Sequence, residues 1–224
     1  MGQRAETIRG LYGTLAGALG PSRWWPGDTP FEVAVGAILT QNTNWQNVEK
    51  AIANLKAAGA LTVQGLAALP AAKVEELIRP AGYFRVKTRR LADFLAFLEQ
   101  EGASAIEDLA VQDLDTLRPK LLKVRGIGPE TADSILLYAL GKPSFVVDAY
   151  TVRLFSRHGL IPEDTHYHEV QEIIQDALPR EVSDYNEFHA LIVRTAKQWC
   201  RKTKPLCATC PARQLLPDTG GFPT

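Results

Sequence analysis

The chain has 224 residues, of which 46% are hydrophobic and 22% charged, and this composition excludes a disordered or low-complexity protein. Its 25 basic and 25 acidic residues cancel, so affinity for a polyanion would have to come from local patches rather than from net charge. The sequence contains no long apolar run and no signal peptide at its beginning, which predicts a soluble cytoplasmic protein without a membrane segment.

Helical periodicity dominates the chain. Apolar residues recur at helical spacing over 31–39, 48–55 and 91–97, and later helices are predicted over 117–124, 131–140, 150–158, 168–178 and 186–200. The β-branched doublet Val146-Val147 is too short to hold a sheet. The pattern therefore predicts an all-α fold, followed by a short disordered tail over 217–224.

A hairpin between two helices is predicted at residues 121–132, Leu-Leu-Lys-Val-Arg-Gly-Ile-Gly-Pro-Glu-Thr-Ala. Pro129 suits the first position of the second helix. Gly126 and Gly128 permit positive φ and a close approach of the backbone to a ligand, while the N–H groups that begin the second helix suit an anion such as a DNA phosphate. A plain αα-hairpin with a tight turn explains the same residues, so this motif alone leaves DNA binding open.

The three cysteines, Cys200, Cys207 and Cys210, lie close together near the end of the chain. An odd number of closely spaced cysteines does not suit a disulfide framework. In a cytoplasmic chain this cluster is typical first of a metal site.

Four segments in this order resemble the endonuclease III family of DNA glycosylases. They are Gly-Ala-Ile-Leu-Thr-Gln-Asn-Thr at 36–43, Gly-Ile-Gly-Pro-Glu-Thr-Ala at 126–132, Val-Asp-Ala-Tyr at 147–150 and the cysteine segment at 200–210. The match covers about residues 25–210.

The resemblance implies two helical domains with a DNA-binding cleft between them. A six-helix domain over 28–142 would carry the helix-hairpin-helix at about 117–137, and residues 1–27 with 143–216 would form the second domain. The implied partner is double-stranded DNA containing a damaged base, bound by a monomer at the nucleoid. Enzymes of this family rotate the damaged nucleotide out of the duplex, because the N-glycosidic bond is unreachable inside the stack.

Asp148 matches the catalytic aspartate of the family. Cleavage of the glycosidic bond builds positive charge on the deoxyribose, and a carboxylate beside the sugar stabilises that cation and can orient the attacking water. An aspartate before Ala-Tyr-Thr-Val-Arg is also an ordinary N-cap of a helix, and both roles can hold at once.

Glu130 occupies the position at which bifunctional members of the family carry a lysine. That lysine attacks the sugar carbon and forms a Schiff base, which permits strand cleavage, and a glutamate cannot do this. An acid in the first turn of a helix is also favoured by the helix dipole. We therefore expect a monofunctional glycosylase that uses water and has no AP lyase activity.

Two branches of the superfamily also replace this lysine, the 3-methyladenine glycosylases and the thymine mismatch glycosylases, and residues 39–50 look more like the first. Aromatic faces stack well on a positively charged alkylated purine. The base pocket is assigned to Trp24, Trp25, Trp45 and Lys197. The alternative is that these tryptophans anchor a crossing between domains and pack in the core.

The resemblance also assigns residues that touch DNA. Gln41 would fill the gap left by the extruded base and Tyr83 would wedge the opposite strand. Arg125, Gly126, Gly128 and Thr131 are the expected contacts of the hairpin. Basic residues expected to bind phosphates are Lys87, Arg89, Arg90, Arg194, Lys197, Arg201 and Lys202.

The iron-sulfur loop of the family has four cysteines, but the fourth position here is Leu216. Four thiolates normally hold a 4Fe-4S cluster, so loss of one leaves an iron open to solvent or oxidation. A cluster held by three cysteines and another ligand such as Asp218 is one interpretation. A cluster that is absent or labile, with the cysteines packed as small hydrophobic residues, is the favoured one.

The sequence thus predicts a base excision repair glycosylase that removes an alkylated purine such as 3-methyladenine. A thymine or uracil mismatch glycosylase is the alternative within the same chemistry. A non-catalytic binder of distorted DNA is a third candidate, although such a protein would not need Asp148 beside an anionic backbone.

Overall fold

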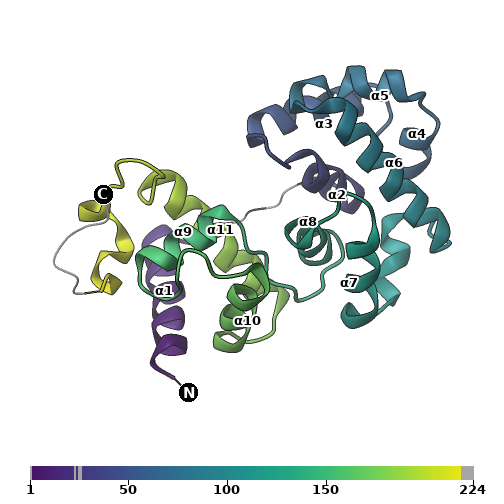
Figure 1. The fold of residues 1–224 in the computed structure, drawn as a ribbon. Coiled ribbons are helices and arrows are strands. Elements are labelled where there is room, and N and C mark those ends of the chain that lie inside the picture. Colours follow the sequence, from purple (N-terminus) through teal and green to yellow (C-terminus); the bar gives the residue numbers. More distant parts are fainter. Residues whose placement is uncertain (1, 23, 25–26, 218–224) are drawn as a thin grey trace. The chain divides into compact units, whose positions relative to one another are not determined.

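The computed structural model describes residues 2–22, 24 and 27–217, and every regular element among them is a helix or a helical turn (Figure 1). The prediction of an all-α fold is confirmed. The chain divides into two compact units, a terminal unit from residues 1–24 and 145–224 and a central unit from residues 25–144. In the described part of the chain, no helix has the length and apolar character needed to cross a membrane.

The central unit is built around the apolar helix α2. Its elements are α2 (Pro30–Leu39), α3 (Trp45–Ala57), α4 (Val63–Ala67), α5 (Ala71–Leu77), η1 (Arg79–Ala81), α6 (Phe84–Gln100), η2 (Ile106–Val111), α7 (Leu114–Lys123), α8 (Pro129–Ser134) and the π-helical turn η3 (Ile135–Ala139). Thr29 caps α2, its hydroxyl accepting from Glu32 N at 3.1 Å, and Pro30 takes the first helical position. Since α2 is apolar on nearly every face, it is buried against α3, α6, α8 and η3.

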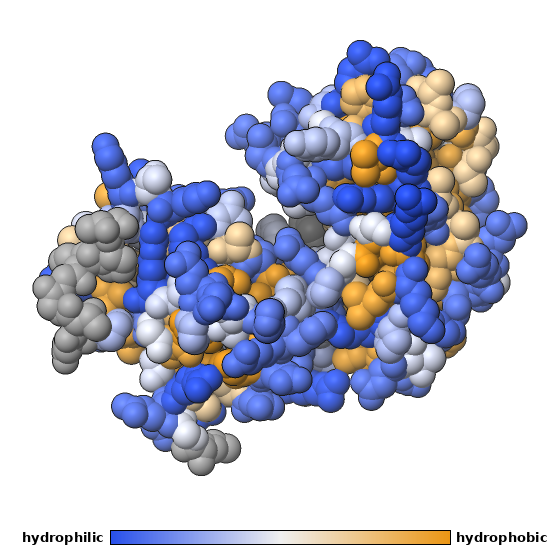
Figure 2. Space-filling view, viewed as in Figure 1, coloured by the Kyte–Doolittle hydropathy of each residue, from blue (hydrophilic) through white to orange (hydrophobic). Residues whose placement is uncertain are grey.

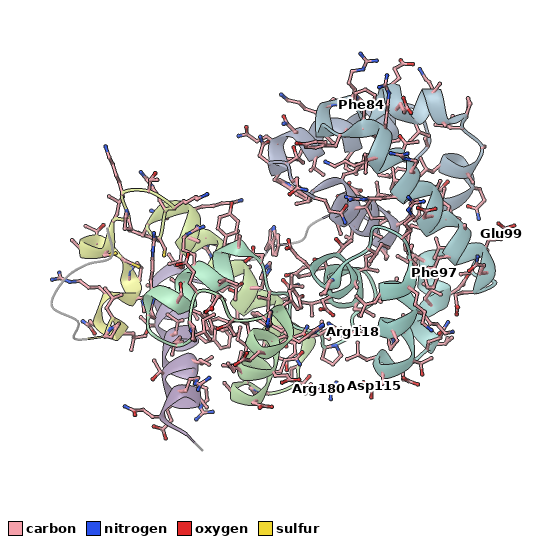
Figure 3. The ribbon with its side chains drawn as sticks, in the orientation of Figure 1. Phe84, Phe97, Glu99, Asp115, Arg118 and Arg180 are labelled. Atoms are coloured by element: carbon pink, nitrogen blue, oxygen red, sulfur yellow. The ribbon has the colours of Figure 1, made fainter. Side chains whose placement is uncertain are left out.

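A buried ion pair joins the two helices of the hairpin. Asp133 on α8 has no solvent exposure, and Arg118 on α7, labelled in Figure 3, donates to its two carboxylate oxygens at 2.8 and 3.0 Å. Ser144, the last residue of the central unit, donates to Asp133 at 2.6 Å. These charge-assisted hydrogen bonds fix α8 to α7 and to the end of the unit.

In its described residues, the terminal unit packs four helices around an aromatic core. They are α1 (Gln3–Leu19), α9 (Ala149–Arg157), α10 (Tyr167–Ala177) and α11 (Val182–Gln198), followed by the turns η4 (Cys207–Thr209) and η5 (Pro211–Leu215). Phe145 packs against Tyr185 and Phe188 at ring-centroid distances of 5.7 and 6.0 Å. Each unit thus has its own core, and Figure 2 shows hydrophilic residues over much of the visible face of each.

Helix α1 was not predicted from the sequence. Its buried residues Ile8, Leu11 and Leu15 have the spacing of one helical face, and they pack against α10 and α11. The alanines and glycines between them dilute the pattern, so the helix is defined by packing more than by periodicity.

Candidate functional site

The hairpin between α7 and α8 uses its two glycines differently. Gly126 has φ +84°, in the left-handed region that favours glycine, whereas Gly128 has φ −93° and is the N-cap of α8. The expectation of positive φ is therefore confirmed at Gly126 and wrong at Gly128. Pro129 does occupy the first position of α8, as predicted. Arg125, Gly126 and Gly128 are exposed, as a DNA-binding turn requires, and their contact with DNA stays a prediction.

The side chain of Gln41 lies on this hairpin. Its Nε2 donates to the carbonyl of Gly126 at 2.9 Å and to the hydroxyl of Thr131 at 2.8 Å, and Arg90 Nη1 donates to its Oε1. Thr131 is buried, and its hydroxyl accepts the hydrogen bond of the Gln41 amide instead of facing solvent. The side chain of Gln41 thus joins the segment after α2 to the hairpin, through one backbone carbonyl and one side-chain hydroxyl.

Tyr83 is 71% exposed and stands at the N-terminus of α6. Its φ of 45° is unusual for a residue with a bulky side chain, and Gly82 before it has φ +68°. The next residue, Phe84, labelled in Figure 3, lies under the guanidinium groups of Arg79 and Arg85 at 5.3 and 5.6 Å. An exposed aromatic ring on a fixed, strained turn is what a wedge residue requires.

Three of the basic residues expected to bind phosphates, Lys87, Arg90 and Arg194, are engaged inside their unit, and Arg90 donates to Gln41 as described above. Lys87 is 1% exposed, and its Nζ donates to the carbonyls of Leu39 at 2.8 Å and Ala81 at 2.7 Å, so its assignment to DNA phosphate is wrong. Burial, with a smaller contribution from Arg90, lowers the pKa of Lys87 to about 8.

Arg194 is likewise engaged within the terminal unit, where its guanidinium donates to the carbonyls of Leu19 and Gly20 that end α1. The positive charge of Arg194 therefore stabilises the C-terminal end of α1, where the helix dipole is negative. The remaining basic residues, Arg89, Lys197, Arg201 and Lys202, are exposed, and their phosphate contacts stay predictions.

Asp148 is the N-cap of α9, as the sequence predicted. One oxygen, Oδ1, accepts from Thr151 N at 2.8 Å and from the Thr151 hydroxyl at 2.9 Å. The other oxygen, Oδ2, lies 3.5 Å from His189 Nε2. Burial alone would raise the pKa of Asp148, but His189 and the hydrogen bonds from Thr151 bring it below its ordinary value, so the carboxylate is charged at neutral pH.

His189 is a site residue that sequence reasoning missed. It stands on the buried face of α11, with its ring 5.7 Å from that of Trp24 and 6.1 Å from that of Phe145. A histidine within the apolar run Phe-His-Ala-Leu-Ile was the available signal, because an ionisable residue on a buried helix face calls for a charged or polar partner.

The predicted pocket tryptophans have different surroundings. Trp24 lies beside His189 in the terminal unit, whereas Trp45 packs on the core of the central unit, with its ring 3.5 Å from where a Cβ on Gly36 would stand. Trp25 lies outside the described residues. Lys197 is exposed on α11. Packing explains Trp45, while Trp24 is the tryptophan found in the surroundings of Asp148.

Glu130 is exposed in the first turn of α8. Its carboxylate favours the positive end of the helix dipole, and its backbone carbonyl accepts from Ser134 Oγ at 2.7 Å. The side chain at this position supplies no amine nucleophile.

The three cysteines line one pocket of the terminal unit together with Leu216 and Arg157. Arg157 Nη1 lies 3.4 Å from Cys200 Sγ, and burial raises the pKa of the Cys207 and Cys210 thiols. Asp218 lies outside the described residues, within which no three His, Cys, Asp or Glu side chains form a metal-binding group. With the apolar side chain of Leu216 at the fourth position, the three thiol groups do not complete a four-thiolate site.

Comparison with known proteins identifies the family. A model of the HhH-GPD superfamily of base excision DNA repair proteins matches residues 35–180. The chain is 48% identical over 212 residues to "Putative DNA repair glycosylase MJ1434" of Methanocaldococcus jannaschii, covering 94% of this chain and 96% of the relative.

Solved structures give the same result. The crystal structure of H. pylori 3-methyladenine DNA glycosylase (MagIII) bound to 1,N6-ethenoadenine has a TM-score of 0.73 and 30% identity, covering 87% of this chain and 97% of that one. A trapped endonuclease III–DNA covalent intermediate has a TM-score of 0.82 at 23% identity, covering 96% of each chain, which shows the fold. The chain therefore belongs to the HhH-GPD superfamily of base excision DNA repair proteins, as a DNA repair glycosylase with the endonuclease III fold.

Proposed function

We propose that the protein is a monofunctional DNA glycosylase that hydrolyses the N-glycosidic bond of an alkylated purine, such as 3-methyladenine, flipped out of double-stranded DNA. Two features of the chain carry this proposal. It keeps a charged aspartate, Asp148, and it has Glu130 at the position where bifunctional members of the family have a lysine. Such a chain keeps the group that stabilises the sugar cation and lacks the amine that would form a Schiff base.

In the proposed reaction, the bond between C1′ and the base nitrogen breaks and its electron pair leaves with the base. Alkylation of a purine ring nitrogen has already placed positive charge on the base, so it departs neutral. The Asp148 carboxylate faces the positive charge that develops on the deoxyribose. Water then adds to C1′ and loses a proton, which leaves an abasic site.

The local structure suits Asp148 to this task. Thr151 holds Oδ1 through two hydrogen bonds, so the carboxylate orientation is fixed by the start of α9. Only 14% of the Asp148 side chain is exposed, which weakens screening by water and makes the charge more effective against a nearby cation. A preorganised carboxylate of this kind needs no rearrangement during the reaction.

The choice of substrate has two supports. The chain is 30% identical, over most of its length, to a 3-methyladenine glycosylase whose structure contains an alkylated adenine derivative, 1,N6-ethenoadenine. In addition, Trp24 places an electron-rich ring beside His189 in the surroundings of Asp148. An aromatic face attracts a cationic base more strongly than a neutral one.

Base release from defined duplexes tests the proposal. The series contains 3-methyladenine, ethenoadenine, uracil, a G·T mismatch and an oxidised pyrimidine. We expect release of the alkylated purines, abasic product that persists until alkali cleaves it, and no adduct trapped by borohydride. Release of thymine alone from the mismatch would establish the alternative substrate, and binding to every duplex without release would establish a non-catalytic binder.

A Glu130→Lys variant provides the matched control for the mechanism. A lysine introduced at this position should produce an adduct that borohydride traps, while the parent protein gives none. An adduct formed by the parent would show that another lysine acts as the nucleophile and would overturn the monofunctional assignment.

A further inference from the structure

We propose that Arg90 is a positioning residue that holds the Gln41 side chain on the hairpin, so that the loop after α2 and the hairpin meet DNA as one preassembled surface. This inference rests on the proposed function, in which Gln41 fills the space left by the extruded base. It differs from the expectation that Arg90 binds a phosphate.

The path of the Arg90 side chain is the first support. From α6 it crosses the hairpin so closely that a Cβ on Gly126 would stand 2.5 Å from Arg90 Cγ and 2.7 Å from Arg90 Nε. Gly126 therefore needs to lack a side chain for two reasons, its positive φ and the passage of Arg90. The end of Arg90 then donates to Gln41 Oε1.

The hydrogen bonds of Gln41 are the second support. Arginine has only donors, so its contact with Gln41 fixes the oxygen of the amide on the Arg90 side. The amide nitrogen must then face the hairpin, where its two N–H groups have two acceptors, Gly126 O at 2.9 Å and Thr131 Oγ1 at 2.8 Å. Arg90 thereby determines the orientation of the whole amide.

Lys87 adds a third support from the same helix. It lies one turn before Arg90, and its ammonium holds the carbonyl of Leu39, the last residue of α2. Helix α6 thus fixes the beginning of the loop through its backbone and Gln41 through its side chain. A loop that is ordered before binding loses less conformational entropy when DNA binds, and this strengthens binding.

A double-mutant cycle tests the inference. Arg90→Met, which keeps the length of the side chain but removes its donors, is combined with Gln41→Ala. The fluorescence of 2-aminopurine opposite an uncleavable abasic analogue reports how far the protein opens the duplex at the lesion. We expect Arg90→Met to reduce this opening about tenfold in the parent and less than twofold in the Gln41→Ala background.

The salt dependence of binding separates positioning from phosphate contact. Loss of a positioning residue leaves the slope of log K against log salt concentration unchanged, whereas loss of a phosphate contact reduces the slope by about one. Equal losses in both backgrounds, together with a reduced slope, would overturn the inference. Arg89→Met, which removes an exposed charge that is predicted to bind phosphate from the same helix, shows the change in slope that a lost phosphate contact produces.

Two further measurements keep the outcomes distinct. Thermal unfolding identifies a variant that has lost its fold. Arg90→Lys, which keeps a charged donor but lacks the planar guanidinium group, should recover part of the duplex opening that Arg90→Met loses. If the parent opens no duplex, the proposed role of Gln41 fails and the inference fails with it. If the parent opens the duplex and Arg90→Met opens it equally well, only the inference about Arg90 fails.

Discussion

The two units hold their candidate residues in opposite settings. In the central unit, Tyr83 is exposed on a turn with positive φ, and Gln41 is held by hydrogen bonds with Arg90, Gly126 and Thr131. In the terminal unit, Asp148 is mostly buried beside His189. Residues proposed to contact DNA need exposed side chains on a rigid backbone. A carboxylate that stabilises a cation needs a fixed orientation and a site from which water is largely excluded.

The largest effect is expected at Asp148, where Asp148→Asn should lower base release by about two orders of magnitude or more, because the amide carries no charge to stabilise the sugar cation. DNA affinity should stay the same or increase. Asparagine is also a good N-cap, so the unfolding temperature should change little. Single-turnover base release, DNA binding by fluorescence anisotropy and thermal unfolding measure these three quantities.

Asp113 supplies the matched control for this substitution. It caps α7 and accepts from the backbone and the hydroxyl of Thr116, as Asp148 does from Thr151. Asp113→Asn should leave base release unchanged. Equal turnover by the two variants would show that Asp148 only caps its helix.

The next effect concerns stability of the central unit. Lys87→Met should lower the free energy of unfolding by about 2 kcal/mol, because the buried carbonyls of Leu39 and Ala81 lose their donor. Urea unfolding measures this loss, and Lys73→Met, at an exposed ion pair of α5, should change stability by less than about 0.5 kcal/mol. A similar small change at Lys87 would mean that water replaces its hydrogen bonds.

The two tryptophans allow a direct comparison of the units. Trp24→Leu should weaken recognition of a cationic alkylated purine by about 1–2 kcal/mol and of uracil by less, since only the cation interacts strongly with the ring face. Trp45→Leu should affect both substrates equally, because its ring packs against α2. Competition by free bases in the release assay measures the contrast, and the reverse ranking would move the pocket to Trp45.

The smallest effect is expected at the exposed wedge. Tyr83→Ala should weaken binding to a duplex with a lesion by about 1 kcal/mol through lost stacking, with no loss of protein stability. Tyr83→Phe, which keeps the ring, should bind like the parent in a titration of lesion duplex. Weaker binding by the Phe variant would assign the contact to the hydroxyl instead of the ring.

Local patterns in the sequence predicted most of the long helices, the hairpin and the cap of α9, but not α1. Gly126, Pro129 and Asp148 each act through neighbours within a few residues, so their types and spacing carry the information. The order of the motifs was equally visible and led to the family that the comparisons identify.

Contacts between distant parts of the chain were decided only by the tertiary structure. Gln41 meets Arg90 and Gly126 across 49 and 85 positions, and Lys87 reaches Leu39 across 48. A basic residue on a helix face has the same local signature whether it binds phosphate or a buried carbonyl, so Lys87 could not be placed from the sequence. The apolar run around His189 indicates that it needs a polar partner, but that partner, Asp148, is brought beside it only when α9 packs on α11.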